Sequence, residues 1–269
     1  MSIGTVNNTT AFSVYSNYTH STHNLQRSMA RLSSGEKAVV DDGAGVAISE
    51  GMRSQATSTA MARNNVDNAI SILQTADGWM QEINNTLARM HELAVESHDA
   101  TKTDSDRDNI QAEFGALEEE INRIVSEAAK FNGKKLLDGT MSGVDTQVGA
   151  DSGQTISVVI TNIASIMSGV TDVSTATNAS SMISELQTQI DTVAQARASV
   201  GGLQGRFEHT RAGLLTYEDN LRAAESKIRD VDMARESSEM TKNQILMQAG
   251  NAMLAQANQL PQNILQLLG

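Results

Sequence analysis

The residue types that could support catalysis or metal binding are few in this chain, and their spacing is incomplete. His20 and His23 stand three apart, so on a helix both imidazoles would share one face and could bind a metal ion, but no carboxylate completes a recognisable ligand set. His91 and Glu92 begin the spacing of a zinc protease motif, and Val95 stands where the second His would be required. We therefore expect no metal, no cofactor and no enzyme activity.

Three clusters of charged residues also have simple structural explanations. The run DDGAG at 41–45 lacks both the Lys of a phosphate-binding loop and the spacing of a dinucleotide-binding loop, so it is interpreted as a turn at a helix start. The acidic run at 118–120 is typical of a solvated helix face. Asp230 and Asp232 could bind a cation, but a helix junction with local capping is the simpler interpretation.

The composition excludes several classes of partner. The net charge of −12 disfavours nucleic acid and anionic membrane surfaces, because both bind clustered Lys and Arg. No stretch approaches the ~20 apolar residues of a membrane span, and the N-terminus has neither a basic leader nor an apolar run, so we expect no cleaved secretory signal. Cys is absent, which excludes disulfides and thiolate metal sites. Pro261 is the single proline and aromatics make up only 3%, a composition that favours long helices packed side by side.

Apolar residues at spacings of three and four predict three long helices, at 44–98, 105–128 and 181–229. The short connection at 101–108 favours antiparallel packing of the first two, and it holds several capping candidates. Short alternation between glycines predicts a β-hairpin at about 138–162, followed by a turn or loop at 163–180. The expected core residues are Ala62, Val66, Ile70, Leu73, Ala76, Met80, Ile83, Leu87, Met90 and Ala94; Ile110, Phe114, Leu117, Ile121, Ile124 and Ala128; and Ile183, Leu186, Ile190, Val193, Ala196, Val200, Leu203, Phe207, Leu214, Tyr217, Leu221, Ala224 and Ile228.

Both ends of the chain carry weaker apolar stripes. Such amphipathic segments are marginal as isolated helices and need a partner that covers the apolar side. We expect the two ends to pair with each other, and copies of the chain to pair with neighbouring copies. The residues expected in this assembly core are Leu25, Leu32, Leu254, Leu260, Ile264 and Leu267.

Several segments together resemble one known family. They are RLSSGEKAVVDDGAGVAIS, INNTLARMHELAVES, IQAEFGALEEEINRI, FNGKKLLDG and IRDVDMARESSEMTKNQILMQAGNAMLAQANQLPQNILQLL, which occur in the order found in bacterial flagellins. The resemblance implies a mainly α fold, a long antiparallel helical rod or coiled coil with a small β-hairpin region. It implies that residues 1–43 and 231–269 form an inner coiled-coil core on assembly, and that 44–230 form an outer rod. Val40 stands where flagellins usually carry Lys.

The resemblance also implies a function. Flagellins are structural subunits that self-assemble into the helical tube of the bacterial flagellar filament, outside the cell, for motility. The implied partners are other flagellin copies, the filament cap, hook-junction proteins, the export apparatus and a chaperone that binds the C-terminal helix; no nucleic acid and no membrane span are expected. Two alternatives stay open: a hook–filament junction protein, and a coiled-coil rod for signalling or binding.

The stretch LARMHELAVES has a more specific implied role. In flagellins the matching stretch lies where subunits stack axially, and it also forms the patch that a vertebrate innate flagellin receptor recognises. By this resemblance the key residues are Arg89, Leu93 and Glu113. Arg89 offers five donors, Leu93 an apolar anchor, and Glu113 a charge from the next helix. Packing within the helical rod is the structural alternative for all three.

Overall fold

The computed structural model describes residues 9–167, 169 and 172–268, and it describes their side chains except those of Thr10 and 260–268. The chain divides into two compact units. We call Met1–Ser54 with Leu221–Gly269 the terminal unit, and Gln55–Asn220 the central unit. The terminal unit thus combines segments from both ends of the chain, whereas the central unit is one continuous segment.

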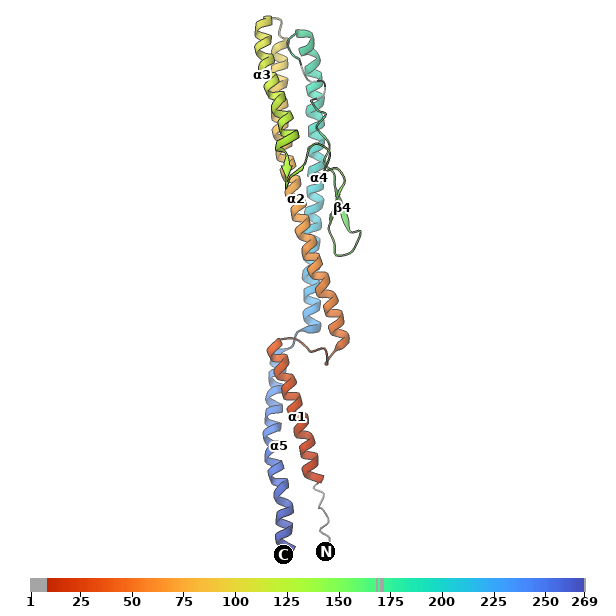
Figure 1. Cartoon of the computed structure of the whole chain (residues 1–269), viewed down its shortest axis with the longest axis vertical. Coiled ribbons are helices and arrows are strands. Elements are labelled where there is room, and N and C mark those ends of the chain that lie inside the picture. The colour runs from red at the N-terminus through yellow and green to blue at the C-terminus, as the bar shows by residue number, and fades with distance from the viewer. Residues whose placement is uncertain (1–8, 168, 170–171, 269) are drawn as a thin grey trace. The chain divides into compact units, whose positions relative to one another are not determined.

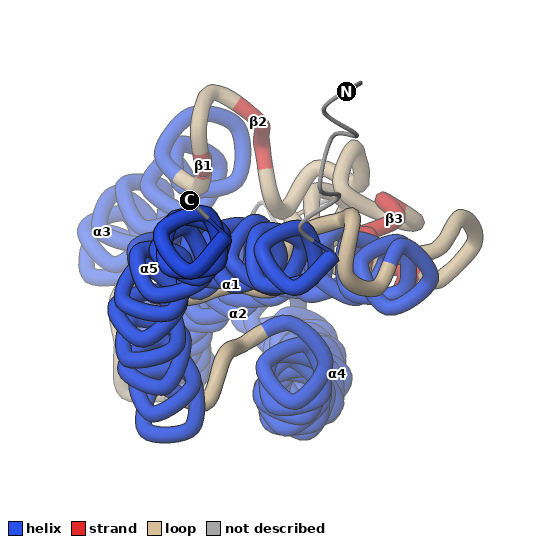
Figure 2. The backbone as a smooth tube through the Cα atoms, turned by 90° about the horizontal axis from the view of Figure 1, so that it is seen from below, coloured by secondary structure: helices blue, strands red, loops and turns tan. Residues whose placement is uncertain are grey.

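The terminal unit is built on helices α1 (Thr9–Ser34) and α5 (Met233–Leu268), which lie side by side (Figures 1 and 2). The expected pairing of the two chain ends is therefore confirmed. The facing residues alternate at spacings of three and four on both helices, which is the seam of a coiled coil. These residues, all buried or half-buried, are Ala11, Val14, Tyr18, Ser21, Leu25, Ser28 and Leu32 on α1 and Glu236, Met240, Asn243, Met247, Gly250, Leu254 and Ala257 on α5.

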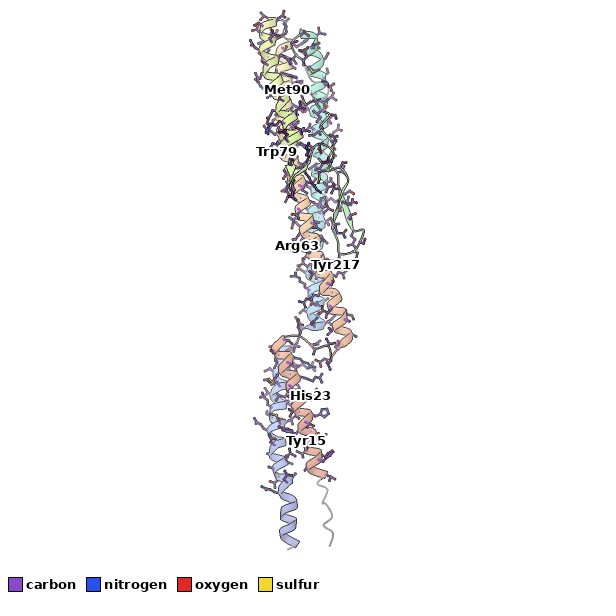
Figure 3. The ribbon with its side chains drawn as sticks, in the orientation of Figure 1. Tyr15, His23, Arg63, Trp79, Met90 and Tyr217 are labelled. Carbon is purple, nitrogen blue, oxygen red and sulfur yellow. The ribbon has the colours of Figure 1, made fainter. Side chains whose placement is uncertain are left out.

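The central unit contains most of α2 (Gly43–His98), α3 (Asp104–Arg123), a π-helical turn (Ile124–Ala128) and most of α4 (Ala176–Arg229), which Figure 1 shows running side by side. The expected apolar seam of α2 is confirmed, because every member from Ala62 to Ala94 is at most 6% exposed. On α4, Ala179, Leu186 and Val193 begin a seven-residue repeat of buried positions that continues through Val200 and Phe207. Figure 3 shows Met90, one of the fully buried side chains, on α2.

The turn between α2 and α3 is fixed by polar side chains. Thr103 caps α3 in a capping box, in which its hydroxyl accepts from Asp106 N and the Asp106 carboxylate accepts from Thr103 N at 3.0 Å. Arg107 is only 8% exposed, and its guanidinium donates to the backbone carbonyls of Ser97, Asp99 and Lys102, each at 2.9 Å. Arg107 thereby satisfies carbonyl groups that the end of a helix leaves unpaired.

Two hairpins follow, where one was predicted. Strands β3 (Val144–Gln147) and β4 (Thr155–Val158) pair antiparallel within the predicted 138–162 region. The hairpin of β1 (Lys130–Phe131) and β2 (Lys134–Lys135) was not predicted, because strands of two residues carry no alternation. Its signal was the Asn132-Gly133 pair, in which both residues have positive φ (47° and 78°) as a tight hairpin turn requires.

Two expectations about α4 need correction. The helix begins at Ala176 and not at 181, because Thr175 caps it: the Thr175 hydroxyl accepts from Asn178 N at 3.2 Å. Tyr217, expected in the core, is 43% exposed, whereas its neighbour Glu218 is 3% exposed (Figure 3 labels Tyr217 and Arg63). Glu218 takes the inward position because Arg63 of α2 forms an ion pair with it at 3.3 Å.

Candidate assembly surfaces

The seam between α1 and α5 is poorly filled with apolar side chains. Leu25, Leu32 and Leu254 lie on it but are only half-buried. Two of its most buried members are polar, Ser28 at 3% and Asn243 at 4% exposed. Ala257 is the single buried apolar residue among the described side chains of the terminal unit. The expected assembly residues Leu260, Ile264 and Leu267 lie outside the described side chains.

The same unit exposes much apolar surface. Phe12 is 76% and Tyr15 57% exposed on α1 (Figure 3 labels Tyr15), and Ile245 is 60% exposed on α5. Large apolar side chains exposed on both helices of a unit with so small an apolar core favour an interaction site. Neither Phe12, Tyr15 nor Ile245 was singled out from the sequence as an assembly residue. The exposed large apolar residues of the terminal unit are Phe12, Tyr15, Met29, Val39, Val40, Ile48, Met233, Ile245, Leu246 and Met253.

Two short chain segments of the terminal unit pair in an antiparallel β-bridge. Residues 35–37 run beside residues 229–231, with backbone bonds from Val231 N to Gly35 O at 3.0 Å and from Lys37 N to Arg229 O at 2.8 Å. The Arg229 side chain donates to Glu36 at 2.7 Å and also to Glu50 near the start of α2. The guanidinium of Arg229 therefore links this bridge to the start of α2.

Arg31 and Asp41 form a second charged hub. Arg31 Nε donates to Asp41 Oδ2 at 2.8 Å, and Arg27 donates to the other carboxylate oxygen. Arg31 also pairs with Glu236 of α5 at 3.4 Å. Hydrogen bonding to Arg31, and then to Arg27, holds the pKa of the Asp41 carboxyl well below its usual range. The hub thus connects α1, the α1–α2 connection and α5.

The charged clusters of the sequence analysis have structural roles among the described residues. Asp42 accepts from Gly45 N at 2.8 Å at the start of α2, as expected for the DDGAG turn. Asp232 accepts from Ala234 N at 3.0 Å and so caps α5, which confirms the interpretation of a helix junction. In the part of the chain that is described, no three His, Asp or Glu side chains gather where they could hold a metal ion.

The residues that the resemblance placed in an axial and receptor patch, Arg89, Leu93 and Glu113, lie on α2 and α3 of the central unit. Arg89 Nη2 donates to Glu113 Oε1 at 2.7 Å, and Arg89 Nη1 donates to Glu92 at 3.1 Å. These hydrogen bonds, first that to Glu113, raise the pKa of Arg89. Arg89 and Glu113 are half exposed. Leu93 differs from the expected surface anchor: it is 1% exposed, because it points into the core with the α2 seam.

The central unit has long helices with a heptad-spaced core, and the terminal helices expose large apolar residues in a single copy. These two features together are typical of structural proteins that assemble through their helices. Comparison with known proteins identifies the member of that class. Residues 6–142 match the model of the bacterial flagellin N-terminal helical region, and residues 183–268 match that of the bacterial flagellin C-terminal helical region. The chain belongs to the bacterial flagellin family, whose members are structural subunits of the flagellar filament.

Individual relatives agree with this assignment. The chain is 45% identical to a flagellin of Halalkalibacterium halodurans, over 90% of this chain and 91% of that protein. It is 41% identical to a flagellin of Bacillus subtilis, over 90% of this chain and 92% of the relative. The crystal structure of Bacillus cereus flagellin aligns with a TM-score of 0.52 at 28% identity, covering 56% of this chain and 88% of that one. The structure of a putative flagellar hook-associated protein from Vibrio parahaemolyticus aligns with a TM-score of 0.61 at 12% identity, covering 71% of this chain and 100% of that one. At this identity the likeness shows a shared fold alone, so it does not favour a junction protein over a filament subunit.

Among the described helices, none combines the length and the apolar character that crossing a lipid bilayer requires. Flagellins form the extracellular filament of the flagellum, so the filament is the location that family membership assigns to this chain.

Proposed function

We propose that this flagellin polymerises by burying the exposed apolar residues of its terminal unit against neighbouring copies. The observation that carries the proposal is the contrast between the units. The central unit buries an apolar seam along α2, α3 and α4, whereas Ala257 is the one buried apolar side chain described in the terminal unit. Burying apolar surface contributes roughly 25 cal/mol per Å². The terminal helices can therefore gain in the polymer the stabilisation that one copy does not supply.

The proposal includes a coupling between folding and assembly. Helices that bury little apolar area are marginal in water, so α1 and α5 would be loosely ordered in a dilute monomer and ordered by neighbouring copies. The division into an inner core of residues 1–43 and 231–269 and an outer rod of 44–230 belongs to this proposal.

The central unit would supply contacts outside the inner core. Arg89 and Glu113 support an axial contact, because they are half exposed and paired with each other across α2 and α3. Leu93 would act there only by holding α2 in place. Recognition of this patch by a vertebrate innate receptor is part of the same proposal and would use Arg89 and Glu113 as its polar contacts.

The remaining proposed roles follow from family membership. The chain would have no catalytic role, since its charged clusters serve as caps and ion pairs. Its further partners would be the filament cap, hook-junction proteins, the export apparatus and a chaperone on the C-terminal helix.

Seeded polymerisation followed by electron microscopy tests the proposal. Purified chain, after seeding or salting-out, should form long hollow filaments, and limited proteolysis should cut both ends in the dilute monomer but not in the polymer. A monodisperse, fully helical and protease-resistant particle that never polymerises would contradict it and favour a signalling rod.

A further inference from the structure

The two helices of the terminal unit carry methionines in a regular arrangement. On α5 they follow one another at spacings of six or seven residues, so one occurs about every second turn, and α1 adds a single one. We call all the methionines of these two helices the terminal methionines: Met29 of α1 and Met233, Met240, Met247 and Met253 of α5.

Solvent reaches the terminal methionines in a single copy of the chain. Three of them are each at least 52% exposed, and the other two, Met240 and Met247, are half-buried on the seam between α1 and α5. This seam is not closed along its length. A cavity of about 390 Å³ lies between the two helices, where Met253 of α5 lines it together with Val14 and Tyr18 of α1. A small dissolved oxidant therefore has access to these side chains.

Most methionines of the central unit are shielded from solvent. Four of them are at most 7% exposed: Met80, Met90, Met141 and Met167. Met61 is the exception at 58%, while Met52 and Met182 on other parts of the chain are half-buried. The chain has no Cys, so no thiol competes with methionine for an oxidant. A mild oxidant should therefore act first on the terminal methionines and on Met61.

Oxidation changes the character of a methionine side chain. Its thioether sulfur attacks one oxygen of hydrogen peroxide and the O–O bond breaks. The sulfur loses two electrons and becomes a sulfoxide, while the other peroxide oxygen takes up the electrons and the protons and leaves as water. The sulfoxide oxygen is a polar acceptor, so its burial without a hydrogen-bond donor costs free energy. A flexible apolar side chain that suits an interface thus becomes one that opposes burial.

We propose that the terminal methionines are an oxidation site that controls assembly: peroxide converts them to sulfoxides in the free chain, and the oxidised chain no longer polymerises. The inference rests on the proposed function, because the sulfoxides act by opposing the burial of α1 and α5. In a filament the same side chains are covered, so the oxidant acts on chains that have not yet assembled. Methionine sulfoxide reductases convert the sulfoxide back to the thioether, which makes the control reversible.

Seeded polymerisation of the full-length chain after treatment with hydrogen peroxide tests the inference, with sulfoxide at each methionine measured by mass spectrometry. The critical concentration should rise by roughly tenfold or more, because one unpaired buried polar group shifts an equilibrium on that scale. A variant with all five terminal methionines replaced by Leu should polymerise normally, since Leu nearly conserves the volume of Met, and should keep its critical concentration after treatment. The matched control, Met61→Leu, should stay as sensitive to peroxide as the unmodified chain.

A second measurement needs no variant. Methionine sulfoxide reductases with a dithiol should restore polymerisation of the oxidised chain, and peroxide should form less sulfoxide at Met233 and Met253 in filaments than in the monomer. Normal polymerisation of the oxidised chain, resistance of Met61→Leu, sensitivity of the five-Leu variant, failure of the reductases to restore assembly, or equal sulfoxide in both states would each overturn the inference. If the untreated chain forms no filament, the proposed function fails; if it does and the treated chain matches it, only the inference fails.

Discussion

Arg31 Nε donates a 2.8 Å hydrogen bond to Asp41 Oδ2, while the Nη1 of the same guanidinium lies 3.4 Å from a carboxylate oxygen of Glu236. One side chain of α1 thus holds both the connection to α2 and the start of α5. Because the terminal unit has so little buried apolar surface, such charge-assisted bonds form a large share of what orders it. Asp41 Oδ2 also accepts from Ala38 N at 3.3 Å, so the hub holds part of the connection between α1 and α2.

The hub predicts a dependence of filament stability on pH. The pKa of the Asp41 carboxyl is lowered in the folded state. The contribution of Asp41 to stability is therefore complete above the ordinary Asp pKa of about 3.9. It is lost as the pH falls below that value, because the unfolded chain binds the proton first. Filaments of Asp41→Asn should depolymerise at a lower temperature than the unmodified filament at pH 7. Between pH 5 and pH 3 the depolymerisation temperature of the Asp41→Asn filament, measured by light scattering, should change less than that of the unmodified filament. An identical pH profile for both filaments would contradict this role of Asp41.

Arg107 is expected to be a main stabiliser of the central unit. Replacing it with Met leaves three backbone carbonyls at the α2–α3 turn without their donor, at a cost of roughly 2–4 kcal/mol in the free energy of unfolding. Urea unfolding of the monomer, followed by circular dichroism, measures this cost. The control is Arg123→Met, which removes only an exposed pair with Glu120 and should cost less than about 1 kcal/mol. Equal effects of the two substitutions would show that the turn does not depend on Arg107.

Substitutions of Leu93 and Arg89 should differ in effect: the first should lower monomer stability and the second should slow filament assembly. Leu93→Ala removes a buried side chain and should lower the free energy of unfolding of the monomer by roughly 2–5 kcal/mol. Arg89→Ala removes exposed ion pairs, so it should change monomer stability by less than about 1 kcal/mol but slow filament elongation. Urea unfolding and seeded elongation rates measure the two effects. Normal elongation of Arg89→Ala would remove the support for an axial contact here.

Removing residues 254–269 should abolish assembly without unfolding the central unit. The deletion takes away Leu254 and Ala257 of the α1–α5 seam, and neither belongs to the core of α2, α3 and α4. The truncated monomer should keep the urea midpoint of the full chain yet leave no sedimentable polymer after seeding. Normal filaments from the truncated chain would contradict the role assigned to the C-terminal helix.

The core of the central unit could be predicted from spacing alone, because apolar residues at every third or fourth position lie on one face of a long helix, and that face must be buried. Tyr217 was wrongly predicted in the core because its aromatic side chain has the right spacing, whereas its neighbour Glu218 is acidic. Only the structure shows that Glu218 forms an ion pair with Arg63. The β1–β2 hairpin was missed because its strands are too short to alternate.

The pairing of the two chain ends was predictable in kind but not in detail. The stripes of both ends indicated that α1 and α5 need partners, and Leu25, Leu32 and Leu254 do lie on the seam between them. The residues left exposed, such as Phe12 and Ile245, could not be identified, because a weak apolar stripe does not show which of its residues the partner helix leaves uncovered. The hubs of Arg31 and Arg229 join residues far apart in sequence, which no local pattern reveals.

Hydrogen exchange of the full-length chain, measured as dilute monomer and as polymer under the same buffer, tests the central claim most directly. The account predicts that amides of α2 and α3 within the central unit exchange slowly in both states, while those of α1 and α5 exchange rapidly in the monomer and become protected in the polymer. Equal protection of α1 and α5 in the dilute monomer would contradict the claim that neighbouring copies complete the terminal unit.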